Sequence, residues 1–419
     1  MIVTGVIAEY NPFHNGHKYQ LEQARRLTGA DYIIVVMNGN FMQRGTPAMW
    51  NKYVRAEAAV ANGADLVLEL PVLYGTASAE FFALGGVRLL DQLRVVSHLC
   101  YGCETTDHDL LSFIARLLTD EPPVYRQTLN QALSHGMSFP KARASAILHT
   151  LEASPIPIPD GLEAFLSMPN TILALEYEKA LLRCNSPILS VPCQRISSTY
   201  HDTVLRDTLS SASAIRREYV QTGCSEHLRT AVPSDVYQAL ATEWNHRAPM
   251  DMDSFYPFLQ YLFWNPPHPL TDYQDISEDL ANRMHAVYQP EYTYSAFTEA
   301  LIHKQYTYTR IYRCLLHMLL DIRKKDFSDQ IASSDMHYAR ILAFRKESAP
   351  LLRELHRSSQ IPLITKLTDG LQALNRQADF LGETLLQKDI AAAHLYEQAV
   401  ANRYLVPAIN EYTHPLIIL

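Results

Sequence analysis

The chain has 419 residues, of which 47% are hydrophobic and 19% charged, and its formal net charge is −8. This length exceeds what one compact core accommodates, and the composition is that of an ordinary globular protein. The net negative charge excludes an overall positive potential that would attract nucleic acid. Any RNA contact must therefore depend on a local basic patch.

The cysteines and the apolar stretches indicate a cytoplasmic protein. Six cysteines in a chain of this size do not predict a disulfide scaffold, and the single C-x-x-C, Cys100 to Cys103, lacks a second pair at zinc-like spacing. The N-terminus has no signal-peptide pattern, and no stretch approaches the roughly 20 apolar residues of a membrane span. We therefore expect no structural metal, and neither a membrane nor DNA as a partner.

The first half of the chain alternates short apolar runs with helical patterns, which is typical of a parallel α/β sheet. The run at 32–37, Tyr-Ile-Ile-Val-Val-Met, is continuously apolar, as expected of a strand covered on both faces. We expect further strands at residues 3–8, 66–70, 95–101 and 188–191, and helices at 16–27, 51–62, 79–93, 170–182 and 211–221.

The remaining patterns are mostly helical. Residues 107–151 predict helices, and the three prolines of 155–159 predict an extended connector. Further helices with apolar spacing are expected at residues 256–264, 299–302, 311–322, 351–356 and 371–403. We therefore expect an α/β fold in which a parallel-sheet domain at residues 1–230 is followed by a mostly α-helical domain at residues 231–419.

One motif that carries chemistry lies between the first expected strand and the first expected helix. It is the sequence Glu9-Tyr10-Asn11-Pro12-Phe13-His14-Asn15-Gly16-His17. The unpaired amides at a helix start and the positive end of its dipole suit phosphate oxygens. Gly16 lets the backbone approach a ligand. His14 and His17 can both donate hydrogen bonds to phosphate oxygens that gain charge as pyrophosphate leaves.

Two other roles for this histidine pair remain open. Isolated histidines near a helix start are often surface residues, and an H-x-x-H pattern can bind zinc. No third Cys, His or carboxylate ligand is evident at local spacing. The position directly after the first strand of an α/β pattern favours the phosphate site.

The strand–HxGH–helix opening resembles the nucleotidyltransferase superfamily, which implies a Rossmann-like sheet. In that superfamily the histidines contact the nucleotide phosphates, and a Ser/Thr-rich motif ending in Ile-Arg closes over them. This chain has such a motif at 210–216, Ser-Ser-Ala-Ser-Ala-Ile-Arg. The hydroxyls of Ser211 and Ser213, the free helix amides and Arg216 suit β- and γ-phosphates. A simple helix cap is the alternative role of the serines.

Longer motifs narrow the resemblance. The segments at 8–17, 36–45 (VMNGNFMQRG), 63–71 (GADLVLELP), 169–170, 200–202 and 304–310 (KQYTYTR) occur in order along nearly the whole chain. They are similar to those of the bacterial tRNA(Met) cytidine acetate ligase family. The resemblance implies that acetate and ATP give acetyl-adenylate and pyrophosphate. The acetyl group then passes to N4 of the wobble cytidine, C34, of elongator tRNA(Met).

The resemblance also implies site residues, with His14, His17 and Arg216 as the catalytic groups and Mg²⁺ held mainly through the phosphates of ATP. The ATP-binding stretch falls on Ile7, Ala8, Glu9, Tyr10, Asn11, Pro12, Phe13, His14, Asn15, Gly16, His17, Lys18, Tyr19 and Gln20. Further nucleotide contacts fall on Gly102, Asn170 and Arg195. Gly102 ends a strand, where ligands of open α/β sheets bind. Helix capping is the alternative role of Asn170, and a surface charge that of Arg195.

The chain departs from the family pattern at a few positions that leave the phosphate-binding motifs unchanged. Asn38 stands where serine is usual, Thr46 replaces a glutamate, and Thr171 replaces an asparagine. Ser197-Ser198-Thr199 replaces a Gly-Ala pair. We expect these positions to lie on loops that shape the acid pocket or the approach of the RNA.

A basic cluster in the helical half is the candidate RNA surface. Its proposed contacts are Lys304, Arg310, Arg313, Lys324 and Lys325. Tyr306, Tyr308 and Tyr312 interleave with the first cations, and we expect them to stack on unpaired bases. The alternative is a solvated charged face.

Two competing functions remain open. One is a small-molecule nucleotidyltransferase of the same fold, which the long helical half disfavours. The other is a non-catalytic RNA-binding protein with a vestigial nucleotide site, which the intact HxGH and Ile-Arg motifs disfavour.

Overall fold

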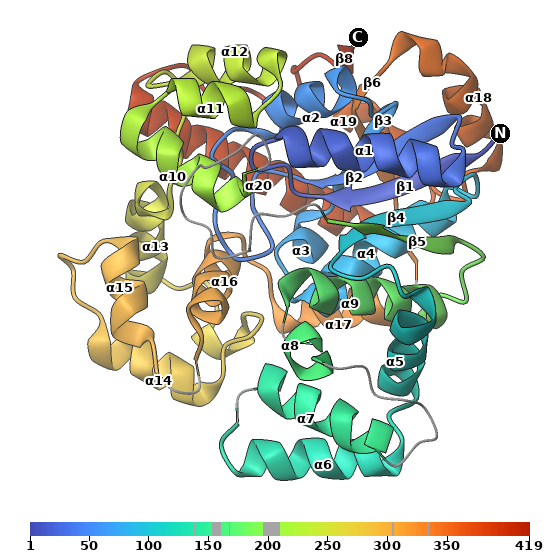
Figure 1. Ribbon diagram of the computed structural model, residues 1–419. Coiled ribbons are helices and arrows are strands. Elements are labelled where there is room, and N and C mark those ends of the chain that lie inside the picture. The colour runs from blue at the N-terminus through green and yellow to red at the C-terminus, as the bar shows by residue number, and fades with distance from the viewer. Residues whose placement is uncertain (138, 153–160, 167, 196–209, 304–305, 334) are drawn as a thin grey trace.

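The computed structural model describes residues 1–137, 139–152, 161–166, 168–195, 210–303, 306–333 and 335–419 (Figure 1). Among these residues, eight strands form one sheet in the order β5-β4-β1-β2-β3-β6-β7, with β8 pairing to β6. The strands are β1 (Val3–Ala8), β2 (Tyr32–Asn38), β3 (Leu66–Leu70), β4 (His98–Cys103), β5 (Leu189–Gln194), β6 (Ala339–Phe344), β7 (Leu363–Ile364) and β8 (Ile417–Ile418).

The five strands of the first half are mutually parallel, as the sequence predicts. Their registers pair Val3 with Tyr32, Ile34 with Leu66, and His98 with both Thr4 and Leu189. Parallel strands present their carboxyl ends at one edge of the sheet. The order in which the strands are added to the sheet reverses between β1 and β4. Open α/β sheets bind ligands at such a switch point.

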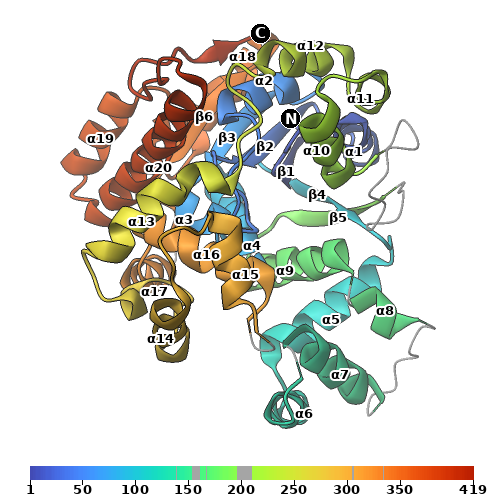
Figure 2. The same ribbon diagram turned by 90° about the vertical axis from the view of Figure 1, so that its left-hand side faces the viewer.

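Helices cover both faces of this sheet, which explains the continuous apolar strands (Figure 2). Ile33 and Val35 of β2 pack on one face with helices α1 (Asn15–Thr28) and α2 (Lys52–Ala61). The alternate residues Ile34 and Val36 pack on the other face with α4 (Ala79–Gln92) and α9 (Pro169–Arg183). A short helix, α3 (Val72–Gly75), follows β3.

The helical segment expected at 107–151 is confirmed. It forms α5 (His108–Asp120), α6 (Pro123–Ser134) and α7 (Phe139–Glu152), and α8 (Leu162–Leu166) precedes α9. The connector expected at 155–159 lies outside the described residues.

Beyond residue 210 the structure is mostly helical. The helices are α10 (Ala212–Thr222), α11 (Glu226–Ala231), α12 (Ser234–Glu243), α13 (Tyr256–Trp264), α14 (Glu278–Val287), α15 (Tyr294–Leu301), α16 (Tyr308–Leu319), α17 (Lys324–Ala332), α18 (Ala349–Ser358), α19 (Leu367–Arg376) and α20 (Phe380–Tyr404). The helix expected at 371–403 is two helices, because the chain turns at Ala378, whose φ is +54°.

Three strands of the second half, β6, β7 and β8, were not expected. β6, Ala-Arg-Ile-Leu-Ala-Phe, pairs antiparallel with β3, so the second half of the chain extends the sheet of the first. A short apolar run is ambiguous between strand and buried helix, since periodicity does not distinguish them. Helices α13 to α16 enclose a separate apolar core, whereas α18 to α20 pack on the sheet core. The division at residue 230 stays a prediction.

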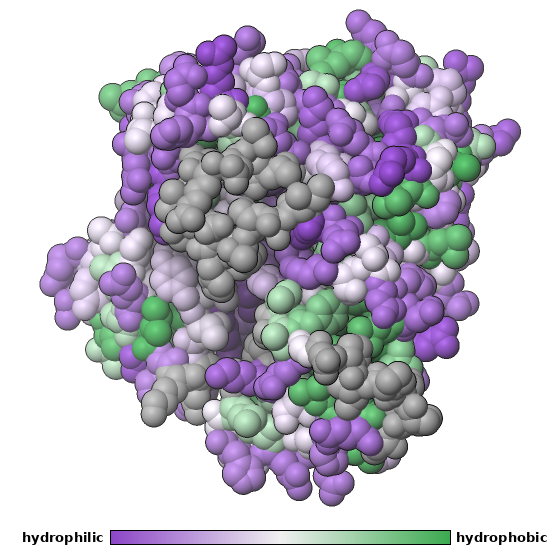
Figure 3. All heavy atoms as spheres, viewed as in Figure 1, coloured by the Kyte–Doolittle hydropathy of each residue, from purple (hydrophilic) through white to green (hydrophobic). Residues whose placement is uncertain are grey.

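No helix within the described ranges is long and apolar enough to cross a membrane. The face drawn in Figure 3 is largely hydrophilic, with apolar residues in scattered patches.

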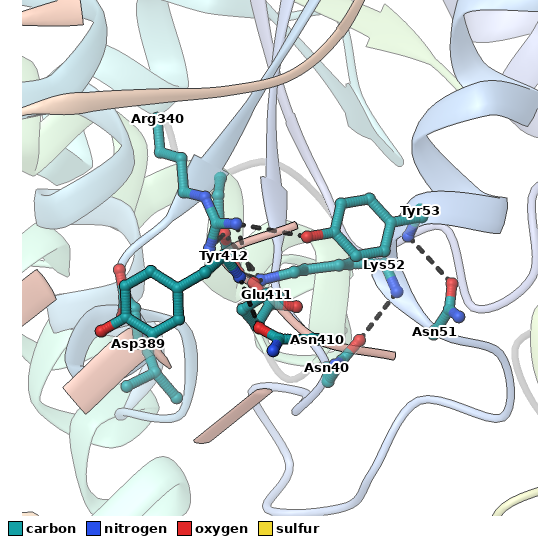
Figure 4. Close-up of polar contacts among 12 residues, drawn as sticks. Asn40, Asn51, Lys52, Tyr53, Arg340, Asp389, Asn410, Glu411 and Tyr412 are labelled. Carbon is teal, nitrogen blue, oxygen red and sulfur yellow. Dashed lines mark hydrogen bonds and ion pairs between the residues drawn. The ribbon is translucent and has the colours of Figure 1, made fainter. Parts of the chain in front are cut away.

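A buried group of four charges joins the C-terminal segment to the sheet (Figure 4). Lys52 Nζ lies 2.8 Å from both Glu69 Oε1 and Glu411 Oε2. Arg340 on β6 contacts the same two carboxylates, at 2.9 and 2.7 Å. Burial raises the pKa of Glu411, but Lys52 and Arg340 outweigh it and hold that pKa at about 2. Two cations and two anions thus neutralise one another inside the protein.

We predict that Lys52→Met destabilises the fold by about 3–5 kcal/mol, because it leaves two buried carboxylates to share one cation. Urea unfolding followed by circular dichroism measures this change. The matched control is Lys325→Met, because the side chain of Lys325 is 77% exposed and pairs with Asp329 at the surface. The control should change stability by no more than about 0.5 kcal/mol. Equal effects of the two substitutions would contradict the role of the network.

Candidate functional site

The HxGH motif lies at the switch point of the sheet. His14 and His17 follow β1, and the chain there turns from the carboxyl edge of the sheet into α1 (Figure 1). The expected placement of the motif is therefore confirmed.

The two histidines cap the helix that they begin. The amide of Gly16 donates to His14 Nδ1 at 3.0 Å, and the amide of His14 donates to His17 Nδ1 at 3.3 Å. The rings stack with their centroids 3.7 Å apart. Since Nδ1 accepts a hydrogen bond in both rings, each neutral imidazole carries its proton on Nε2. Both rings therefore have their Nε2–H groups available as donors.

The surroundings keep both rings neutral. Burial, followed by the charges of Arg195 and Arg216, lowers the pKa of His14 to about 3. Burial, then His14 and Arg195, lowers the pKa of His17 well below its ordinary value. Neutral donors beside two guanidinium groups suit an anion such as a phosphate.

Glycine is required at position 16 for a structural reason as well as for the expected approach of a ligand. A Cβ at this position would lie 2.8 Å from Cε1 of His14. The glycine therefore leaves room for the imidazole that accepts from its own amide.

A buried arginine that the sequence did not single out holds the start of the motif. Arg55 on α2 is 2% exposed and donates to the carbonyl oxygens of Glu9 (2.7 Å), Trp50 (3.1 Å) and Gly39. Burial lowers the pKa of Arg55 to about 10, so the group stays charged at neutral pH. Arg55 thus ties the end of β1 to the end of β2.

The structure brings the second motif to the first, as predicted. Arg216 on α10 donates to the carbonyl oxygen of Asn11 at 2.8 Å and to Ser213 Oγ at 3.1 Å. Ser211 caps α10 by accepting from the amide of Ala214 at 3.1 Å. Burial lowers the pKa of Arg216, whose guanidinium contacts the HxGH loop at Asn11.

The three other expected nucleotide contacts form one cluster at the ends of β4 and β5. Arg195 Nη1 donates to Asn170 Oδ1 at 3.1 Å. The side chain of Arg195 lies over Gly102, where a Cβ would be 3.3 Å from its Cγ. Asn170 lies within α9, and the capping position belongs to Met168, so the capping alternative for Asn170 is wrong.

The other residues of the expected ATP-binding stretch differ in how far their side chains are buried. The side chains of Ile7, Tyr10 and Phe13 belong to the apolar core and leave mainly backbone groups for a ligand. Asn11 accepts from the amide of Met49 at 3.0 Å, and Asn15 donates to Thr230 O at 2.8 Å. Pro12 is buried, Lys18 is exposed, and Ala8, Glu9, Tyr19 and Gln20 are half-buried.

The family departures do not all act as expected. Asn38 is fully buried and donates to the carbonyl oxygens of Phe41 (3.1 Å) and Gly75 (2.8 Å). It therefore fixes backbone instead of lining a pocket. Thr46 accepts from the amide of Met42 through its carbonyl, and residues 197–199 lie outside the described residues.

Three residues of the basic cluster contact neighbouring segments of the chain; Arg310 and Arg313 are half-buried, and Lys324 is exposed. Arg310 and Arg313 contact Asp275 at 3.3 and 3.5 Å, and Lys324 donates to Ile276 O at 2.8 Å. Lys325 is exposed, whereas Lys304 lies outside the described residues.

The expected stacking role of two tyrosines in this cluster is wrong. Tyr306 and Tyr312 are buried in the core of the helices around α16, and Tyr308 is 45% exposed. The side chains of Tyr306 and Tyr312 serve packing, and Tyr308 is the accessible ring of the three.

Within the described ranges, no three His, Cys, Asp or Glu side chains gather as metal ligands.

The chain resembles known proteins over its whole length. Residues 1–407 match the family model described as HIGH Nucleotidyl Transferase. The chain is 37% identical over 425 residues to the tRNA(Met) cytidine acetate ligase of Acetivibrio thermocellus, with 100% of both chains covered. It is 37% identical over 400 residues to that of Halothermothrix orenii, with 94% of both covered.

A solved structure is similar as well. The crystal structure of Thermotoga maritima TmcAL bound with alpha-thio ATP superposes with a TM-score of 0.89 at 30% identity, covering 100% of both chains. The apo form of the same protein gives a TM-score of 0.90 at 31% identity.

We predict that His14 and His17 remain neutral Nε2–H tautomers from pH 8 down to pH 5. Their folded-state pKa values lie below the ordinary 6.5, so protonation favours the unfolded chain as the pH falls below that value. Two-dimensional ¹H–¹⁵N NMR of the histidine rings reports both the tautomer and the titration. Titration of either ring near pH 6.5 would contradict the hydrogen-bond assignment.

Proposed function

Because the chain belongs to the tRNA(Met) cytidine acetate ligase family, we propose that it activates acetate with ATP and acetylates N4 of the wobble cytidine, C34, of elongator tRNA(Met). Membership in this family confirms the resemblance inferred from the motifs. The observation that carries the proposal is the stacked pair His14 and His17, with Nε2–H donors beside Arg216 at the switch point.

The first step forms the adenylate. A carboxylate oxygen of acetate attacks the α-phosphorus of ATP, and the bond to the β-phosphate oxygen breaks as pyrophosphate leaves. His14, His17 and Arg216 donate to oxygens that gain negative charge in this step. Mg²⁺ on the phosphates would supply further charge neutralisation.

The second step transfers the acetyl group. The N4 amine of the cytidine attacks the acyl carbon and loses a proton, and AMP leaves with the electron pair of the broken C–O bond. No nucleophilic side chain is required, because the mixed anhydride is already activated. Positioning of the two substrates supplies the rate.

The tRNA surface is proposed around α16 and α17. Lys324 and Lys325 offer exposed charges, while Arg310 and Arg313 shape the surface through their contacts with Asp275. Lys304 completes the proposed set. We also propose a cytoplasmic location, since tRNA and ATP are both present there.

Pyrophosphate exchange into ATP, measured with and without acetate, tests the first step. Acetyl transfer to transcripts of elongator tRNA(Met) tests the second. Acetate-dependent exchange together with RNA acetylation is expected. Exchange that depends on another substrate would instead support a small-molecule nucleotidyltransferase. tRNA binding without any exchange would support the vestigial alternative.

We predict that His17→Ala lowers acetate-dependent exchange by at least about 10²-fold, because it removes one donor to the leaving pyrophosphate. The affinity for tRNA, measured by filter binding, should stay nearly unchanged. The control is His135→Ala, which replaces an exposed histidine at the C-cap of α6. A parallel loss of exchange and tRNA affinity would show that His17 acts only on the fold.

A further inference from the structure

A glutamate that neither the sequence patterns nor the family resemblance singled out connects the elements around Arg195. Glu104 follows β4 directly. Its Oε1 accepts from Asn170 Nδ2 at 2.7 Å, and its Oε2 accepts from Thr171 Oγ1 at 2.9 Å. Both oxygens therefore bind side chains of the first turn of α9. The contacts are not those of a helix cap, which would accept from backbone amides.

The chemistry of the carboxylate fixes the direction of the next contact. An ionised carboxylate accepts hydrogen bonds and donates none, so the amide of Asn170 must turn its Nδ2 toward Glu104. Its Oδ1 then faces Arg195 and accepts from Nη1 at 3.1 Å. If the amide were reversed, its oxygen would face the carboxylate and its NH₂ group would face the guanidinium. Glu104 thus determines which group Asn170 offers to Arg195.

Two further contacts fix the position of Arg195. The amide of Arg195 donates to Cys103 O at 3.0 Å, and its side chain lies over Gly102. The guanidinium is close enough to lower the pKa of His14 and of His17, and Arg216 also lowers that of His14. The imidazole pair therefore has one arginine from the end of β5 and another from α10 in its surroundings.

We propose that Glu104 is a positioning residue that, through Asn170, holds Arg195 as the second cationic group of the ATP phosphate site, beside Arg216. This inference rests on the proposed function, since it takes the nucleotide to be ATP. It extends that function by assigning a role to a residue that makes no contact with the nucleotide itself.

The test compares Glu104→Gln with Thr171→Val. Glu104→Gln removes the charge that orders the amide and is expected to raise the KM for ATP in exchange by about tenfold, with kcat and the KM for acetate unchanged. Thr171→Val removes one hydrogen bond to Glu104 but leaves the contact with Asn170, so its KM for ATP should stay within about twofold of the unmodified protein. An unchanged KM for ATP in Glu104→Gln would overturn the proposal.

A double-mutant cycle distinguishes positioning from a general structural role. If Glu104 acts through Arg195, Glu104→Gln adds nothing to the loss caused by Arg195→Ala. Additive losses would overturn the proposal. Thermal unfolding of the nucleotide-free protein shows whether Glu104→Gln folds. If it does not, Asn170→Ala, which removes the link between Glu104 and Arg195, takes the place of Glu104→Gln in the cycle.

Calorimetric titration with a non-hydrolysable ATP analogue, in the absence of acetate, tests the proposed function and the role of Glu104 separately. Failure of the unmodified protein to bind would contradict the proposed function. Binding by the unmodified protein with equal affinity for Glu104→Gln would contradict only the role of Glu104. The expected result is binding by both, about tenfold weaker in the variant.

Discussion

The reciprocal hydrogen bonds between two imidazoles and the backbone at the start of α1 are the constraint on which the site depends. His14 and His17 satisfy helix amides that would otherwise lack partners, and the same bonds fix the tautomer of each ring. A cap made of histidines therefore does two things at once. It begins the helix, and it leaves two neutral N–H donors beside the positive end of the helix dipole.

The sheet supplies the surroundings of that cap. The order of strands reverses between β1 and β4, and the cap follows β1 at this switch point, where open α/β sheets bind ligands. Arg216 approaches from α10, and Arg195 from the end of β5. Arg55 ties the ends of β1 and β2 together. Lys52 extends this support toward the C-terminal segment, since its amide donates to Asn40 and its ammonium group contacts Glu411.

Local patterns in the sequence predicted the features that local physics determines. Continuous apolar runs marked the parallel strands, and the HxGH and Ser-rich motifs marked two helix starts that meet in space. The contacts of Glu104 with α9 and of Arg55 with Glu9 were not foreseen. They join residues 66, 67 and 46 positions apart, which only the fold brings together. β6 was missed since a six-residue apolar run carries no distinguishing period. The role of Tyr312 was misassigned because helical spacing does not reveal which face of α16 is buried. Tyr306 precedes α16, and the local pattern does not show the contacts that bury it.

Determination of the structure with a slowly reacting ATP analogue tests most directly whether the capped histidine pair is a phosphate site. We expect phosphate oxygens at about 2.7–3.1 Å from Nε2 of both His14 and His17, with Arg216 on the same triphosphate. A triphosphate bound away from both rings, or rings turned so that Nδ1 faces the ligand, would contradict this conclusion.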